Sequence, residues 1–247
     1  MKNLFLLGGL PRSGITLLSS ILNQNPIIYV TTSSPFVEIL WRTFNVWEED
    51  TDVGTHNIQE SRTPFLRKLP YAYYSELTDK PIIIDKRRQW QGVTNIELYE
   101  KSFGVLPKII CPVRSCEDIV ASYVNIYKKN NIEFDYDKEL TGNRFEICYN
   151  QLKDAFNSGY RDCFLLVEYI DLVEKTEAVL EQICKFIDIP LYEHNLDYVF
   201  TTEPEANHGI NGLHDIRHVI EKSTTNSCRV LGDEQFSKFQ DWNFWRK

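Results

Sequence analysis

The sequence lacks any apolar run that could cross a membrane. A bilayer span needs roughly 20 consecutive apolar residues, and no segment of the 247 residues approaches that length. Met1 and Lys2 precede apolar residues as in a signal peptide, but Pro11 and Arg12 end this apolar run after a few residues. We therefore expect a soluble, cytoplasmic protein with no membrane partner.

Paired cysteine motifs are also absent. No two of the six cysteines form a CxxC pair, so the sequence predicts neither a zinc site nor a thioredoxin-type motif. Scattered thiols are typical of a reduced cytosolic protein. The positions are Cys111, Cys116, Cys148, Cys163, Cys184 and Cys228.

Basic residues are too few for a general nucleic-acid binder. The chain has 27 lysines and arginines against 35 acidic residues, a net charge of −8, whereas binding to a phosphate backbone needs a basic surface. A polyanionic ligand must therefore be bound by a local basic site. The length and the 43% hydrophobic content allow one substantial core, and we expect a single domain over residues 1–247, with no nucleic-acid partner and the oligomeric state left open.

One stretch, Asn3–Leu18, has the pattern of a strand, a phosphate-binding loop and a helix. Leu4–Leu7 form a short apolar run, as in a parallel strand buried on both faces. Residues 8–14 contain three glycines and a proline, and glycines let backbone N–H groups close around an anion at a helix N-terminus. The alternative is an ordinary turn with a surface arginine.

The loop departs from the Walker pattern of nucleotide triphosphatases at one position. Four residues separate Gly9 from Gly14 and a hydroxyl follows at Thr16, but Ile15 stands where that pattern requires lysine. The cation is instead Arg12, whose planar guanidinium suits a phosphate or a transferring sulfonate.

Strand-like and helix-like segments alternate along the chain, which predicts βαβ units. The fold class we expect is α/β, a central parallel sheet with flanking helices in three layers. Residues 48–62 are expected to be a surface loop, the tail from residue 201 a loop that covers a ligand, and residues 232–247 an amphipathic piece packed on the body. The expected strands are 4–7, 27–31, 81–85, 108–113 and 163–167, and the expected helices are 15–22, 36–47, 94–103, 115–129, 174–187 and a mixed helical region over 134–157.

Basic residues follow two of the predicted strands. Lys86, Arg87 and Arg88 come after one strand, and Arg114 follows another. Ligands of open α/β sheets collect at the carboxyl ends of the strands, although a solvated loop cluster is the simpler alternative. Ser122 lies eight residues after Arg114, in the second turn of the next helix, and could reach the same anion.

Three separated segments carry a resemblance to a known family. GLPRSGITLLSSILNQNP resembles the 5′-phosphosulfate loop of sulfotransferases that use 3′-phosphoadenosine-5′-phosphosulfate (PAPS), especially the PRSGTT form of tyrosylprotein and bacterial members. CPVRSCEDIVASY resembles their 3′-phosphate segment, and LLVEYIDLVEKTEAVLEQICKFIDIP resembles their YEDL segment with its helix. The resemblance covers residues 3–190 as the core, and the tail over 201–247 is similar to the donor-covering loop.

The resemblance implies a sulfotransferase of P-loop-like fold that needs no metal and releases 3′-phosphoadenosine-5′-phosphate (PAP). It implies that the 5′-phosphosulfate is held by the loop, with Ile15 acting through its backbone N–H, and that Arg12 and Lys86 stabilise the transferring group. A second set binds the 3′-phosphate, the adenine and the covered face of the donor. The loop set is Arg12, Ser13, Gly14, Ile15 and Thr16, and the second set is Arg114, Ser122, Tyr169, His208, Gly209 and Arg217.

The general base is not identified by match. Ile15 replaces a common threonine, and Thr32 and Ser33 occupy the positions six and seven residues after Pro26, where tyrosylprotein relatives carry a glutamate. Glu38 is the first candidate for the catalytic base, although it could equally form an ion pair with the residue four positions on, Arg42. His56 and Asp85 are the next candidates.

The acceptor also stays open. Aromatic residues between 36 and 90 suit a small molecule, a carbohydrate or a tyrosyl peptide, and in such numbers they are more often core. Two alternatives to sulfonate transfer to a hydroxyl or amine are a nucleotide kinase on the same loop and a nucleotide-binding protein without transfer activity. The aromatic residues are Phe36, Trp41, Phe44, Trp47, Phe65, Tyr71, Tyr73 and Tyr74.

Overall fold

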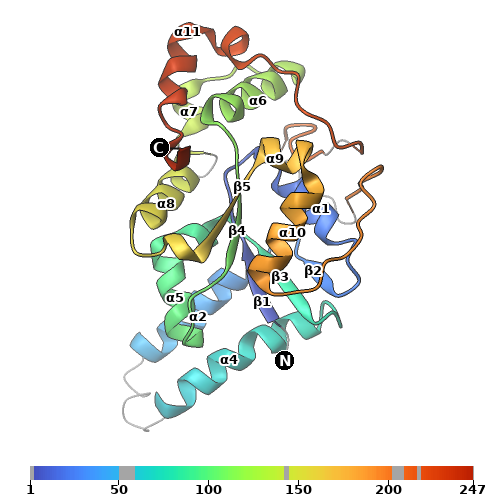
Figure 1. The fold of residues 1–247 in the computed structure, drawn as a ribbon. Helices are drawn as coiled ribbons and strands as arrows, with labels where there is room; N and C mark the ends of the chain where they lie inside the picture. Colours follow the sequence, from blue (N-terminus) through green and yellow to red (C-terminus); the bar gives the residue numbers. More distant parts are fainter. Residues whose placement is uncertain (1–2, 50–58, 142–144, 202–208, 216–217, 247) are drawn as a thin grey trace.

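The structure is a computed structural model of the chain, and it describes residues 3–49, 59–141, 145–201, 209–215 and 218–246 (Figure 1). A five-stranded sheet crosses the middle of the molecule, and its strand order is β2-β3-β1-β4-β5. Every pair of neighbouring strands is parallel. The strands are β1 (Asn3–Leu7), β2 (Ile28–Val30), β3 (Ile82–Lys86), β4 (Ile109–Val113) and β5 (Phe164–Glu168).

Helices cover both faces of this sheet. In Figure 1, α1, α9 and α10 lie on one side of the sheet, whereas α2, α5 and α8 lie on the other. The bounds are α1 (Ile15–Leu22), α2 (Phe36–Glu49), α4 (Gln59–Ser75), α5 (Val93–Phe103), α6 (Cys116–Lys129), α7 (Tyr136–Leu140), α8 (Glu146–Asn157), α9 (Tyr169–Glu174), α10 (Thr176–Ile187) and α11 (Ser227–Gln240), with 3-10 turns η1 (Arg88–Gln91), η3 (Arg161–Cys163) and η4 (Phe244–Arg246).

Alternate residues of each central strand enter opposite cores. Leu7 and Ile110 belong to the core beneath α1 and α10, whereas Leu6 and Ile109 belong to the core beneath α2 and α5. Successive side chains of a strand point to opposite faces, so a strand covered on both sides must be apolar throughout. The three-layer α/β prediction is therefore confirmed.

The segment before β3 differs from the expectation. Residues 48–62 were expected to be a surface loop, but α2 continues to Glu49 and α4 begins at Gln59, while residues 50–58 lie outside the described ranges. Helix α4 contains Pro64 and Pro70, which disfavour helix in isolation. Packing of its buried Leu66 and Tyr74 into the core beside α2 and α5 overrides this propensity.

Two other helical segments have different limits from those expected. The region 134–157 is divided into α7 and α8, and α9 precedes α10 where one helix over 174–187 was expected. The C-terminal helix α11 starts at Ser227, before the expected piece, and Gly232 interrupts it with a left-handed φ of 74°. Contacts between α11 and α6, which local sequence patterns do not encode, hold this helix in place.

The C-terminal segment caps helix α6 from a distance. Cys116 N donates to Asn243 Oδ1 at 2.8 Å, and Asn243 Nδ2 donates to Glu117 Oε2 at 2.9 Å. Ser115 stands at the N-cap of α6 without a side-chain cap, so the buried Asn243 supplies the missing acceptor. The expectation that this segment packs on the body is confirmed, since Trp242 and Trp245 lie against the α6 core.

Replacing Asn243 by alanine should lower the free energy of unfolding by about 1–2 kcal/mol, because it leaves the first turn of α6 without its acceptor and orphans Glu117. Urea unfolding followed by circular dichroism measures the change. The exposed Asn157 is a matched control, and Asn157→Ala should stay within about 0.5 kcal/mol of wild type. Equal stability of both variants would show that the distant cap is dispensable.

Candidate functional site

The loop of residues 8–14 joins β1 to α1 and packs directly against β4. A Cβ atom at Gly9 would lie 2.7 Å from the carbonyl oxygen of Pro112, and Gly9 has a φ of 116°. Arg12 also adopts a positive φ, 58°, which is uncommon for a residue with a side chain. The path of the loop therefore requires glycine at position 9 and places Arg12 in a sparsely populated conformation.

The N-terminus of α1 is open toward an anion. Gly14 is the N-cap residue with no side chain to cap the helix, and the first turn contains no acidic residue. The first N–H groups of a helix lack partners within the helix, and together with the helix dipole they favour a bound anion. The 5′-phosphosulfate that the resemblance implies fits this position.

Two loop residues use their side chains inside the protein. The Ser13 hydroxyl is fully buried beside two main-chain acceptors, Leu10 O at 2.5 Å and Pro112 O at 2.8 Å, and it has one proton to donate. Ile15 packs against the core beneath α10. Both residues therefore present backbone groups, rather than a hydroxyl or an ammonium, to a ligand.

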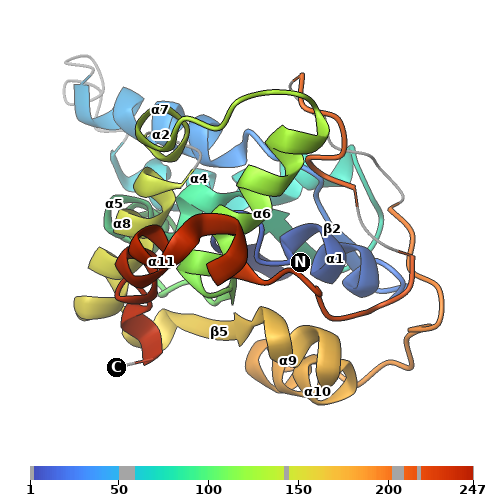
Figure 2. The ribbon, with the colours of Figure 1, turned by 90° about the horizontal axis from the view of Figure 1, so that it is seen from above.

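Four of the predicted donor-binding residues lie together, although they come from three separate segments of the chain. Arg12 Nε donates to Ser122 Oγ at 3.2 Å, and Arg114 Nη1 donates to Arg12 O at 3.3 Å. The Arg114 guanidinium lies over the Tyr169 ring at 4.6 Å, and a Cβ atom at Gly14 would lie 2.9 Å from that ring. Arg12 precedes α1, Arg114 precedes α6, and Ser122 and Tyr169 lie on α6 and α9, the helices labelled in Figure 2.

Burial lowers the pKa of the Arg12 guanidinium from its ordinary value. The nearby Arg114 charge also lowers this pKa, while Tyr123, Tyr169 and Asp215 act in the opposite direction. Two guanidinium groups held close together in a partly buried place repel each other. A bound anion offsets this repulsion, so the arrangement favours a negatively charged ligand.

One described stretch of the C-terminal tail, residues 209–215, lies against this cluster. Leu213 O accepts a hydrogen bond from Arg12 Nη1. Asn211 and Asn130 exchange hydrogen bonds of 2.9 and 3.1 Å, which attach the segment to the end of α6. Gly209 is exposed with a φ of 82°. His208 and Arg217, which were also expected to bind the donor, lie outside the described residues.

Successive hydrogen bonds between buried groups fix the backbone of Lys86 at the end of β3. Its backbone N–H donates to Thr31 Oγ1 at 2.8 Å, and Thr31 Oγ1 donates to Asp85 Oδ1 at 3.1 Å. Trp90 Nε1 donates to the other carboxylate oxygen, Asp85 Oδ2, at 2.7 Å. Burial raises the pKa of Asp85. Because Asp85 is 0% exposed, this geometry favours a positioning role over that of a base for an acceptor.

Glu38 forms its ion pair with a residue other than the one expected. Arg87 Nη2 lies 2.8 Å from Glu38 Oε1, whereas the helical spacing indicated Arg42 as the partner. Arg87 is also held by Gln89 Oε1 at 2.8 Å and by Ser33 Oγ at 3.3 Å. Glu38 Oε2 makes no hydrogen bond within the described part of the chain. Glu38 therefore contacts the residue next to Lys86, and His56 lies outside the described residues.

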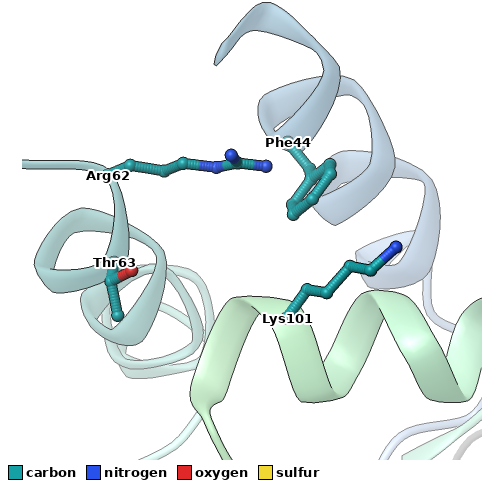
Figure 3. A pocket seen from close by; sticks show the side chains of 4 residues that line it. All are labelled: Phe44, Arg62, Thr63 and Lys101. Carbon is teal, nitrogen blue, oxygen red and sulfur yellow. The ribbon is translucent and has the colours of Figure 1, made fainter. Parts of the chain in front are cut away.

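The aromatic residues expected near an acceptor are divided between core and surface. Phe36 and Tyr74 are fully buried and pack on each other with ring centroids 5.2 Å apart. Phe44 lines a hollow of about 380 Å³ together with Arg62, Thr63 and Lys101 (Figure 3). No predicted donor-binding residue within the described ranges lines this hollow, so it is separate from the cluster around Arg12.

Sequence reasoning missed two contributors to the site. Leu213 acts through its carbonyl group, which every residue has, and no sequence pattern could identify it. Gln91 is a fully buried polar residue that accepts a hydrogen bond from Gly9 N. A glutamine shortly after an apolar strand was the available signal, but its burial was not apparent from the sequence.

The fold defines an α/β protein of the P-loop-like class. The chain matches the sequence model of the sulfotransferase domain family over residues 2–203, and it therefore belongs to this family. It is an enzyme that transfers a sulfonate group, which sets aside the kinase alternative. Within the described residues, no cluster of metal-ligating side chains and no helix fit to cross a bilayer is found.

Solved structures share the fold at low sequence identity. The sulfotransferase domain from the curacin biosynthetic pathway is 16% identical, with 96% of this chain and 97% of that chain covered and a TM-score of 0.54. The sulfotransferase domain of the olefin synthase from Synechococcus PCC 7002 is 18% identical, with 96% of each chain covered and a TM-score of 0.53. Mouse sulfotransferase SULT7A1, complexed with PAP, is 14% identical, with 98% and 82% covered and a TM-score of 0.55. No curated protein matches the sequence.

Proposed function

We propose that this sulfotransferase takes its sulfonate from PAPS and transfers it to a hydroxyl or an amine. The observation that carries the proposal is the convergence of Arg12, Ser122, Arg114 and Tyr169 beside the open N-terminus of α1. The structurally similar mouse enzyme is complexed with PAP, which supports a bisphosphorylated nucleotide as the ligand.

The two ends of the donor would occupy different parts of the site. The backbone N–H groups from Ser13 to Thr16 and the Arg12 guanidinium would hold the 5′-phosphosulfate. Arg114 and Ser122 would hold the 3′-phosphate, and the Tyr169 ring would lie near the adenine. Gly209 belongs to the segment that would cover the donor, and we retain His208 and Arg217 as predicted members of it.

The chemistry needs positive charge on one side of the sulfur and a base on the other. When bound, PAPS supplies a sulfonate whose bond to the bridging phosphate oxygen breaks as the acceptor atom bonds to sulfur. Arg12 and Lys86 would stabilise the negative charge left on the phosphate, because fixed cations in a water-poor site act where charge develops. Glu38 would take the proton of the acceptor, with Arg87 holding one of its oxygens.

The acceptor is a small molecule, a carbohydrate or a tyrosyl peptide. It would approach from the side of Glu38 and the first turn of α2, where Ser33 and Arg87 add polar groups. All six cysteines are free thiols, which supports a reducing compartment such as the cytoplasm.

Arg12→Ala should reduce sulfonate transfer by about 10²-fold to 10³-fold, because the variant loses a cation that acts on the developing charge. Transfer of ³⁵S from labelled PAPS to a panel of phenols, sugars and tyrosyl peptides measures the rate, and calorimetry measures PAP affinity. The affinity should fall less than the rate. Arg229→Ala, at an exposed arginine, is the control and should leave both unchanged.

Equal losses of transfer rate and of PAP affinity in Arg12→Ala would show that Arg12 only binds the nucleotide and has no catalytic role. Tight binding of PAP by the wild type without transfer to any acceptor of the panel would contradict the proposed acceptor classes.

Arg114→Ala should weaken PAP binding by about 10-fold to 100-fold while leaving the affinity for adenosine 5′-phosphate nearly unchanged. The reason is that a charge-assisted hydrogen bond to the 3′-phosphate contributes about 1.5–3 kcal/mol. Competition binding with the two nucleotides gives the ratio directly. A ratio equal to that of the wild type would refute the assignment of the 3′-phosphate to Arg114.

Glu38→Gln should lower kcat by about 10²-fold to 10⁴-fold, because the amide cannot take the acceptor proton. The substitution keeps the size of the side chain and an oxygen for Arg87, so PAP affinity and thermal stability should change little. Glu177→Gln, at an exposed glutamate on α10, is the matched control. Full activity of Glu38→Gln would show that another residue is the catalytic base.

A further inference from the structure

Gln91 is a buried polar residue that the proposed chemistry does not use. It ends the 3-10 turn that follows β3, and it is 0% exposed. Burying a side-chain amide is unfavourable unless its oxygen and nitrogen find hydrogen-bond partners. The identity of these partners therefore indicates what this residue does.

The amide of Gln91 connects the donor loop to two other elements. Its oxygen Oε1 accepts from Gly9 N at 2.7 Å and lies 3.8 Å from Cys111 Sγ on β4. Its nitrogen Nε2 donates to Cys148 O on α8 at 2.5 Å. A Cβ atom at Gly8 would lie 3.2 Å from Oε1, so the loop and the amide are in close contact.

The place of this contact follows from the register of the sheet. On one side of β1, the N–H groups of Leu6, Gly8 and Leu10 donate in turn to main-chain carbonyls on and beside β4, at distances of 2.9–3.1 Å. On the other side, Asn3 N donates to Pro81 O, and Leu7 pairs with Lys86. Gly9 is the next donor on this second side, and the register assigns it the carbonyl of residue 87.

That carbonyl, Arg87 O, forms its hydrogen bond within the turn that follows β3. Arg87 O accepts from Trp90 N at 3.1 Å, because the chain turns into η1 directly after β3. The buried Gly9 N–H bonds to Gln91 Oε1 instead, so this side-chain oxygen takes the place of the strand carbonyl. The Gln91 side chain thus adds one hydrogen bond to the series made by the β3 side of β1, at the point where the loop begins.

We infer that Gln91 is a positioning residue for the donor loop, which sets the peptide plane at Gly9 and hence the direction of the backbone toward Arg12 and the N-terminus of α1. The inference rests on the proposed function in assigning that loop to the donor. The hydrogen bond itself does not depend on which donor binds.

The first test is amide hydrogen exchange of the free protein, measured by NMR in wild type and Gln91→Met. Methionine is similar in size but offers no oxygen. Exchange at Gly9 should accelerate by about 10-fold or more, while Gly8 and Leu10, whose acceptors belong to the β4 side, keep their protection. Unchanged exchange at Gly9 would overturn the inference.

The second test is PAP affinity, measured by calorimetry on the same variants. Gln91→Met should bind PAP about 10-fold to 100-fold more weakly. Gln91→Glu should recover most of the loss, because burial favours the protonated acid, which keeps an oxygen for Gly9 and an O–H donor for Cys148 O. Leu66→Ala is the control for general destabilisation, because Leu66 is buried on α4 in the core beside α2 and α5. An equal loss of PAP affinity in Leu66→Ala would mean that Gln91 is only structural and would overturn the inference.

The two tests also separate the inference from the proposed function. If the wild type fails to bind PAP, the proposed donor is wrong, whereas the exchange measurement still decides the role of Gln91. If Gln91→Met does not fold, Gln91→Glu decides alone. It should retain the protection of Gly9 and bind PAP within about 3-fold of wild type, and loss of both would overturn the inference.

Discussion

The close packing of the loop at residues 8–14 against β4 is the constraint on which the rest of the site depends. Gly9 lies so near the carbonyl of Pro112 that no larger residue fits. This contact brings the Ser13 hydroxyl to the same carbonyl and places Arg114, two residues further on, beneath the carbonyl of Arg12. Arg12 and Arg114 lie close together because β1 and β4, the strands that precede them, are parallel neighbours. The chain therefore leaves both strands at the same edge of the sheet.

Buried polar groups at the end of β3 give this edge a defined geometry. Asp85 and Thr31 hold the backbone of Lys86, and Gln91 holds that of Gly9. Each of these groups is unfavourable in an apolar interior unless its partners are in place, so the network tolerates few alternative arrangements. Fixed donors of this kind are suited to stabilising charge that develops during a reaction.

The proposed anion site of this acidic chain depends on a local concentration of positive charge. The net charge is −8, yet Arg12 and Arg114 are close enough for each to affect the other, and burial lowers the pKa of Arg12. The Ser122 hydroxyl and the Leu213 carbonyl accept from the Arg12 guanidinium. These contacts keep two mutually repelling guanidinium groups, those of Arg12 and Arg114, close together. The arrangement favours a negatively charged ligand over the stability of the empty protein, as is common at functional sites.

The sequence by itself determined the α/β class, all five strands and the limits of α1, because apolar runs and glycines are local signals. Its resemblance to the sulfotransferase family identified Arg114, Ser122 and Tyr169 as partners of Arg12 at one site. Tertiary structure decided the rest. Helix α4 forms through Pro64 and Pro70 because its apolar face is buried, and Glu38 pairs with Arg87 because α2 packs beside the end of β3. The amide of Gln91 reaches Gly9 across 82 positions of the chain. Such contacts depend on which chain segments become neighbours in the folded sheet, and no local pattern carries that information.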